Sequence, residues 1–166
     1  MNPVTEKENQ IPSLYEWLGG AEMLNALMVK FYERVSADEL LQPLFGDMPA
    51  DHPRHVADFV GEVLGGSLAY TVSRGGHATM LAHHFGKNIS EAQRRRWVNL
   101  LLDTADETGL PSDPEFRSAL VAYLEWGSRL AVMNSKLPAE TVADPATPMP
   151  RWSWGVPGGP YKPEQE

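Results

Sequence analysis

The sequence contains no cysteine and no apolar run of the length that a membrane-spanning helix needs. Without cysteine, the chain cannot form disulfides, thiolate zinc sites or iron–sulfur clusters, and it has no thiol nucleophile. A membrane span requires roughly 18 or more consecutive apolar residues. Residues 1–10 are polar and lack the apolar core of a secretory signal. We therefore expect a cytoplasmic protein that does not insert into a membrane.

Basic residues are also scarce, because 14 Lys and Arg oppose 22 Asp and Glu and give a formal charge of -8 at pH 7. Proteins that bind nucleic acids neutralise the phosphates with clustered Lys and Arg. The one basic cluster is residues 94–96, and the helical pattern around it predicts a solvated face. Nucleic acid is therefore not an expected partner.

The alternating runs of β-branched residues that indicate β-strands are missing too. Apolar residues recur at helical spacing between Leu14 and Met133, so we predict an all-α protein. Serine followed three residues later by Glu or Gln, at Ser13 and Ser90, marks two helix starts. We expect helices to begin near residues 13, 21, 40, 52, 77, 90 and 112, with a loop over residues 67–76.

Composition divides the chain into three parts. We predict a flexible N-terminal segment over residues 1–12, one helical domain over 13–136, and a proline-rich tail over 137–166. The tail contains Trp152, Trp154 and Tyr161. Large aromatic side chains are unusual in a segment that never buries surface. We therefore expect the tail to dock on the helices of its own chain.

All five histidines lie between positions 52 and 84. They are His52, His55, His77, His83 and His84. Histidine clustered beside apolar helical stripes is typical of a metal or cofactor site. The pattern alone leaves two alternatives open, a cofactor or a divalent metal held by His52 and His55 with His77 or His84.

From about Ser13 to Ser135 the chain resembles the group II truncated haemoglobins. The matching features, in chain order, are Gly19-Gly20, Phe31-Tyr32, Phe45, Phe59, Gly65-Gly66, Tyr70, Arg74-Gly75, His77, His84, Ile89-Ser90 and Trp97. The resemblance implies a two-over-two helical sandwich around haem b. In such a protein a single neutral histidine binds the iron and leaves the other axial position to a diatomic ligand.

The resemblance implies that His84 is the ligand of the haem iron. The preceding His83 would point about 100° away on a helical turn and lie near the haem propionates. His77 leads into this region, so we expect His77, His83 and His84 all to contact the cofactor. The basic residues that family members carry just before the ligand are absent here, where residues 78–83 read ATMLAH.

On the other side of the haem, the resemblance places three hydrogen-bond donors, Tyr32, His52 and Trp97. Phe45, Val56 and Phe59 would contact the cofactor, as would Trp97. Donors aimed at the bound ligand stabilise the negative charge that it gains from the iron. An exposed histidine titrates near pH 6.5, so we also expect ligand binding to change near that pH through His52.

The implied function is reversible binding of O2, NO or CO, with NO dioxygenase or related redox activity. No glycine-rich dinucleotide fingerprint is present in the sequence, so we expect a separate reductase as a partner. A peroxidase-type oxidation on the same fold is the alternative enzymatic function, and a non-haem histidine metal site is a third. The sequence leaves the oligomeric state open, a homodimer included.

Overall fold

The structure is a computed structural model that describes residues 11–160. These residues form helices and no β-strand, which confirms the all-α prediction. The helices are α1 (Leu14–Leu18), α2 (Gly20–Ala37), α3 (Gln42–Phe45), α4 (His52–Val63), α5 (Ala69–Arg74), α6 (His77–Ala82), α7 (Glu91–Glu107) and α8 (Pro114–Ser135). None of the helices in this part of the chain is both long and apolar enough to span a membrane.

Side chains cap the helices at the predicted starts. The Ser13 hydroxyl accepts a hydrogen bond from the Glu16 backbone N–H at 3.0 Å and opens α1. At α7, Ser90 and Gln93 cap each other's backbone N–H groups, so the predicted capping box is present. The Asp113 carboxylate caps α8, with Pro114 in the first turn, where its missing N–H costs no hydrogen bond.

The predicted loop over residues 67–76 is wrong, because residues 69–74 form α5. A buried carboxylate holds this short helix: Glu62 accepts hydrogen bonds from the Thr71 backbone N–H at 3.1 Å and from its hydroxyl at 2.6 Å. Tyr70 is the only residue of α5 that is buried. The segment therefore lacks the repeated apolar spacing from which helices are predicted.

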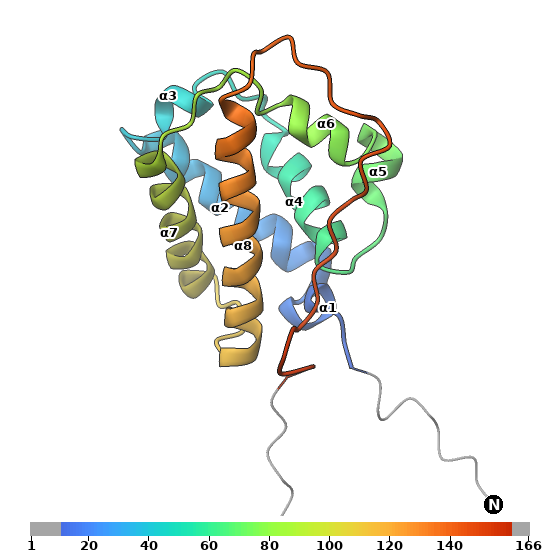
Figure 1. Cartoon of the computed structure of the whole chain (residues 1–166). Helices are drawn as coiled ribbons and strands as arrows, with labels where there is room; N and C mark the ends of the chain where they lie inside the picture. Colours follow the sequence, from blue (N-terminus) through green and yellow to red (C-terminus); the bar gives the residue numbers. More distant parts are fainter. Residues whose placement is uncertain (1–10, 161–166) are drawn as a thin grey trace, which may run out of the picture.

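Two helix pairs, α2 with α4 and α7 with α8, build the two layers, and α2 also packs on α7 (Figure 1). Each of α2 and α4 turns an apolar stripe inward, as helical periodicity predicts. The buried stripe residues are Leu24, Leu27, Met28, Phe31, Tyr32 and Val35 on α2, and Val56, Phe59, Val60 and Val63 on α4. This is the predicted two-over-two sandwich.

After α8, the tail returns along the outside of the helices, past α6 and α5 to α1 (Figure 1). The Trp152 backbone N–H donates to the Val63 carbonyl at 2.9 Å, and the Trp154 indole N–H donates to the Pro12 carbonyl at 2.7 Å. Docking of the tail on its own chain is thereby confirmed for these two tryptophans. Tyr161 and most of the predicted N-terminal segment lie outside the described residues.

Candidate functional site

A cavity of about 800 Å³ lies between α2, α4, α6, α7 and α8. Its volume falls within the roughly 300–1,000 Å³ of sites that hold small molecules and cofactors. Every residue that the sequence predicts for the site lines this cavity: Tyr32, Phe45, His52, Val56, Phe59, His77, His83, His84 and Trp97. The fold therefore brings together residues from five helices, α2, α3, α4, α6 and α7, and from the turn after α6.

Tyr32 is the centre of an aromatic cluster on one wall of the cavity. Its ring centroid lies 4.7 Å from that of His52, in a perpendicular arrangement, and 5.7 Å from that of Phe45. Burial raises the pKa of the Tyr32 phenol well above its usual range, while a hydrogen bond with Trp97 acts in the opposite direction. The phenol is therefore protonated at neutral pH and can donate a hydrogen bond.

His52 is the first residue of α4 and points into the cavity region with its Nε2 atom buried. This Nε2 makes no hydrogen bond to the described residues. Burial lowers the pKa of His52 to about 4, and the neighbouring His55 and His83 add to the effect. The expected titration near pH 6.5 is therefore wrong for this site, because desolvation keeps the imidazole neutral.

His83 and His84 lie on the turn that follows α6 and differ in burial. His83 is exposed, whereas His84 is half-buried, and its Nδ1 is buried without a hydrogen bond to the described residues. Burial lowers the pKa of His84 to about 4, and His83, His77 and His52 lower it further. His84 is therefore neutral at pH 7, which is the form of histidine that binds metals.

His77 begins α6 and is buried against the cavity. Burial lowers the pKa of its ring, and a hydrogen bond to the backbone carbonyl of Pro148 opposes that shift. The Nδ1 atom of His77 has no hydrogen-bond partner among the described residues. The tail therefore lies beside the His77 ring through Pro148.

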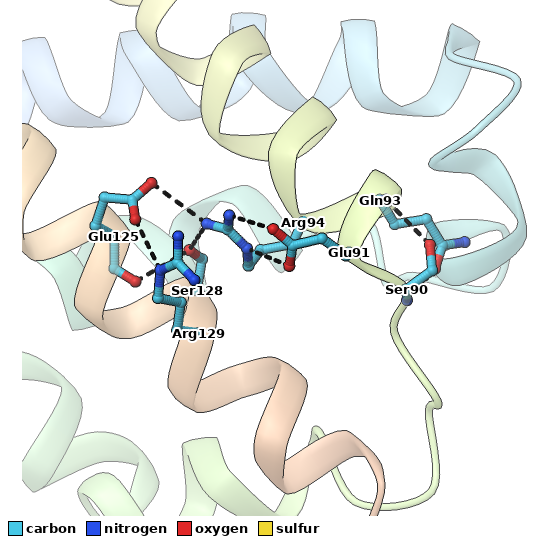
Figure 2. Close-up of polar contacts among 7 residues, drawn as sticks. All are labelled: Ser90, Glu91, Gln93, Arg94, Glu125, Ser128 and Arg129. Atoms are coloured by element: carbon cyan, nitrogen blue, oxygen red, sulfur yellow. Dashed lines mark hydrogen bonds and ion pairs between the residues drawn. The ribbon is translucent and has the colours of Figure 1, made fainter.

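The prediction of a solvated face over residues 94–96 is wrong for Arg94, which is 5% exposed and lines the cavity. Its guanidinium donates to Glu91 at 2.9 and 2.7 Å and to Ser128 at 3.1 Å, and lies 3.4 Å from Glu125 (Figure 2). Figure 2 shows this cluster joining α7 to α8. Glu91, three residues earlier on the same helix, is the one partner that the sequence pattern reveals.

The cavity fits haem better than a bare metal ion. Its walls are largely aromatic and aliphatic, and it offers buried imidazole nitrogens without partners, at His84 Nδ1 and His52 Nε2. A large apolar cofactor bound through one neutral imidazole matches this set of groups. Within residues 11–160, no three His, Asp or Glu side chains gather as a metal site, so the structure lends no support to the non-haem alternative.

Residues 13–126 match the family of bacterial-like globins, and the chain therefore belongs to this family. Among its relatives it is similar to the group 2 truncated hemoglobin YjbI of Bacillus subtilis (strain 168). The two sequences are 33% identical over 117 residues, which cover 70% of this chain and 86% of the relative. The match confirms the resemblance to group II truncated haemoglobins.

Solved structures agree with the sequence match. The group II truncated hemoglobin of Bacillus anthracis superposes with a TM-score of 0.68 at 26% identity, over 80% of this chain and 98% of that one. The truncated oxygen-avid haemoglobin of Bacillus subtilis gives 0.65 at 31% identity, over 73% and 99%. The fold is thus that of a truncated globin, whose haem iron binds small diatomic ligands such as O2.

Proposed function

We propose that the chain binds O2 and related diatomic ligands reversibly at a haem iron held by His84, and that it oxidises NO with electrons from a separate reductase. One observation carries the proposal. Three hydrogen-bond donors, Tyr32, His52 and Trp97, line the same cavity as the neutral, half-buried His84. This division of roles between donors and iron ligand is what reversible binding of a polar diatomic ligand requires.

His84 is the residue proposed to hold the iron. Haem held by His84 would supply an iron that binds a diatomic ligand. Burial keeps the His84 imidazole neutral, so at pH 7 no second proton competes with the iron for the free ring nitrogen. His83, which is exposed, lies at the edge of the cavity, where contact with the haem propionates is its proposed role.

Packing between aromatic rings holds the proposed ligand-binding wall in place. Phe31 fixes Trp97 from behind, with ring centroids 5.3 Å apart at 86°. The Tyr32 phenol stays protonated and can donate a hydrogen bond. Each hydrogen bond donated to a charged ligand stabilises that ligand by about 1.5–3 kcal/mol. Tight retention of oxygen is supported by the similarity to the Bacillus subtilis protein, which is described as oxygen-avid.

A single-turnover experiment tests the proposed NO chemistry. The ferrous protein is equilibrated with O2, freed of excess gas and mixed with one equivalent of NO, and nitrate and the visible spectrum are then measured. We expect one nitrate per haem and a ferric product that turns over again only when a reductase is added. Absence of nitrate, or failure of the ferrous protein to take up O2, would contradict the proposal.

A peroxidase-type reaction is a second candidate, favoured by the neutral state of His52. The neutral imidazole of His52 lines the cavity and has a buried Nε2 without a partner among the described residues, so it can accept a proton from a peroxide that enters. Peroxide-dependent oxidation of a phenol should then be fast and should fall about 10²–10⁴-fold in His52→Ala. Slow turnover that is equal in both proteins excludes this role for His52.

A further inference from the structure

We propose that residues 148–154 of the tail act as an intramolecular strap that positions the α6 and α8 walls of the haem cavity, with Trp152 as the positioning residue. The strap contacts cavity-lining residues from outside without lining the cavity itself. The inference rests on the cavity as the haem site but not on which histidine binds the iron.

On the α8 side, Trp152 packs behind two residues of the cavity wall. Its ring centroid lies 5.6 Å from that of Tyr123 and 5.7 Å from that of Trp126. Tyr123 and Trp126 both line the cavity, so Trp152 forms a second layer behind them. Aromatic pairs at these separations are attractive beyond the area that they bury. Trp152 therefore holds this part of α8 at a fixed position.

On the α6 side, the strap holds His77. Burial lowers the pKa of its ring, the Pro148 carbonyl beside the ring opposes that shift, and the Nδ1 atom of the ring has no hydrogen-bond partner among the described residues. No side chain caps the N-terminus of α6, which begins at His77. This six-residue helix leads directly to His83 and His84. The contact with Pro148 thus lies at the start of the helix that leads to the cavity histidines.

Two further hydrogen bonds fix the strap to the rest of the molecule. The Trp152 N–H is bound to the Val63 carbonyl at the end of α4, and the buried Trp154 is bound to Pro12 and packs on Trp17 with ring centroids 5.9 Å apart. The helix packing of α8 runs mainly through α7 (Figure 1). The strap therefore connects α8 to α6, α4 and α1 on the opposite side of the cavity.

A loosened strap should let the two walls separate, which opens a route both for haem loss and for ligand entry. The test uses the full-length holoprotein and Trp152→Ala, with Val156→Ala as a matched control, because Val156 belongs to the same tail and is fully exposed. Haem transfer to excess apomyoglobin and CO recombination after photolysis are measured. We expect both rates to rise about two- to tenfold in Trp152→Ala, the equivalent of one aromatic pair. Val156→Ala should match the wild type.

Two more variants separate positioning from general stability. Trp152→Phe keeps an aromatic ring and should give intermediate rates. Leu110→Ala removes a buried side chain that does not line the cavity, so it should lower the melting temperature and leave CO recombination unchanged. If Trp152→Ala matches the wild type in both rates, or if Leu110→Ala accelerates CO recombination equally, the strap has no positioning role.

A readout on the haem-free protein keeps this inference separate from the proposed function. Hydrogen exchange of the α6 amides should be about two- to tenfold faster in haem-free Trp152→Ala than in the haem-free wild type. Equal exchange would overturn the strap. A full-length protein that takes up no O2 would instead overturn the proposed function, whatever the exchange rates show.

Discussion

Two walls of the cavity are built in different ways. The donor wall, formed by Tyr32, Phe45, His52 and Trp97, draws on the long helices α2, α4 and α7 as well as α3, and its rings contact one another directly. The histidine wall, formed by His77, His83 and His84, belongs to a six-residue helix and the turn after it. Glycines with positive φ flank this helix on both sides, at Gly75-Gly76 and Gly86.

Ring packing and the hydrogen bond between Tyr32 and Trp97 hold the donor wall, whereas we expect the tail to help position the histidine wall. Besides the Pro148 carbonyl at His77, the Leu137 carbonyl accepts a hydrogen bond from the Gly86 N–H at 2.8 Å. Long helices with many buried contacts are the most stable parts of a fold, and short helices between glycines are among the least stable. We therefore expect substitutions in the two walls to separate ligand binding from cofactor retention.

The largest effect is expected when the proposed iron ligand is removed from the histidine wall. His84→Ala should abolish stable haem incorporation, because it removes the proposed iron ligand, whereas His83→Ala should largely retain the normal Soret spectrum. His83 is the matched control, since it is adjacent in sequence and exposed. If the two variants behave alike, or if only His83→Ala loses haem, the ligand is wrongly assigned.

The next effect concerns the donor wall. Tyr32→Phe and Trp97→Phe should each accelerate O2 dissociation about ten- to a hundredfold, as expected for one lost hydrogen bond to a charged ligand, while haem stays bound. The double variant should show less than the product of the two effects, because both donors serve the same ligand. Stopped-flow dissociation measurements test this, and unchanged rates in both single variants would contradict the donor role.

A smaller effect should distinguish two glycines that share a left-handed conformation. Gly86 has φ +76 and Gly109 has φ +79, so alanine should cost each site about 1–2 kcal/mol of backbone strain. At Gly86 the new Cβ would also lie 2.7 Å from the Cβ of Ala139, whereas nothing lies within 4 Å at Gly109. Denaturant unfolding should therefore show a larger loss for Gly86→Ala, and faster haem loss in that variant alone. Equal losses of stability in the two variants would mean that Ala139 moves away from the new Cβ without a measurable cost.

The last expected effect is a dependence of stability on pH in the haem-free protein. His52 has a pKa of about 4 in the folded chain and about 6.5 when unfolded, so the unfolded chain binds more protons between these values. The free energy of unfolding should thus fall as the pH drops from 6.5 towards 4 and stay level above 6.5. Urea titrations should show a shallower fall in His52→Gln, where His84 still contributes. An identical fall in both proteins would assign the dependence elsewhere.

The sequence predicted the helices whose signals are local and repeated. The capping pair Ser90 and Gln93 and the apolar stripe of α2 lie within one helix, so spacing alone reveals them. The resemblance to group II truncated haemoglobins predicted which aromatic residues and histidines meet at the cavity. Their roles stay predictions until haem and ligands are measured.

Features that depend on distant partners could not be predicted. Arg94 is buried because Glu125 and Ser128 reach it from α8, more than thirty residues along the chain. The low pKa of His52 arises first from burial between helices, to which His55 and His83 add. Helix α5 depends on the buried carboxylate of Glu62, and a short segment with one apolar contact shows no periodicity.

The bond between Trp154 and Pro12 joins positions 142 residues apart and brings the beginning and the end of the described chain together beside α1 (Figure 1). A Cβ at Gly159 would lie 3.2 Å from the Ile11 side chain. In topological terms the described chain is almost a closed ring. A short linker between residues 11 and 159 would complete that ring, and the exposed turn at Gly109, between α7 and α8, would allow it to be reopened. Such a circular permutant would begin with α8 and the tail and still contain every helix and every residue of the cavity.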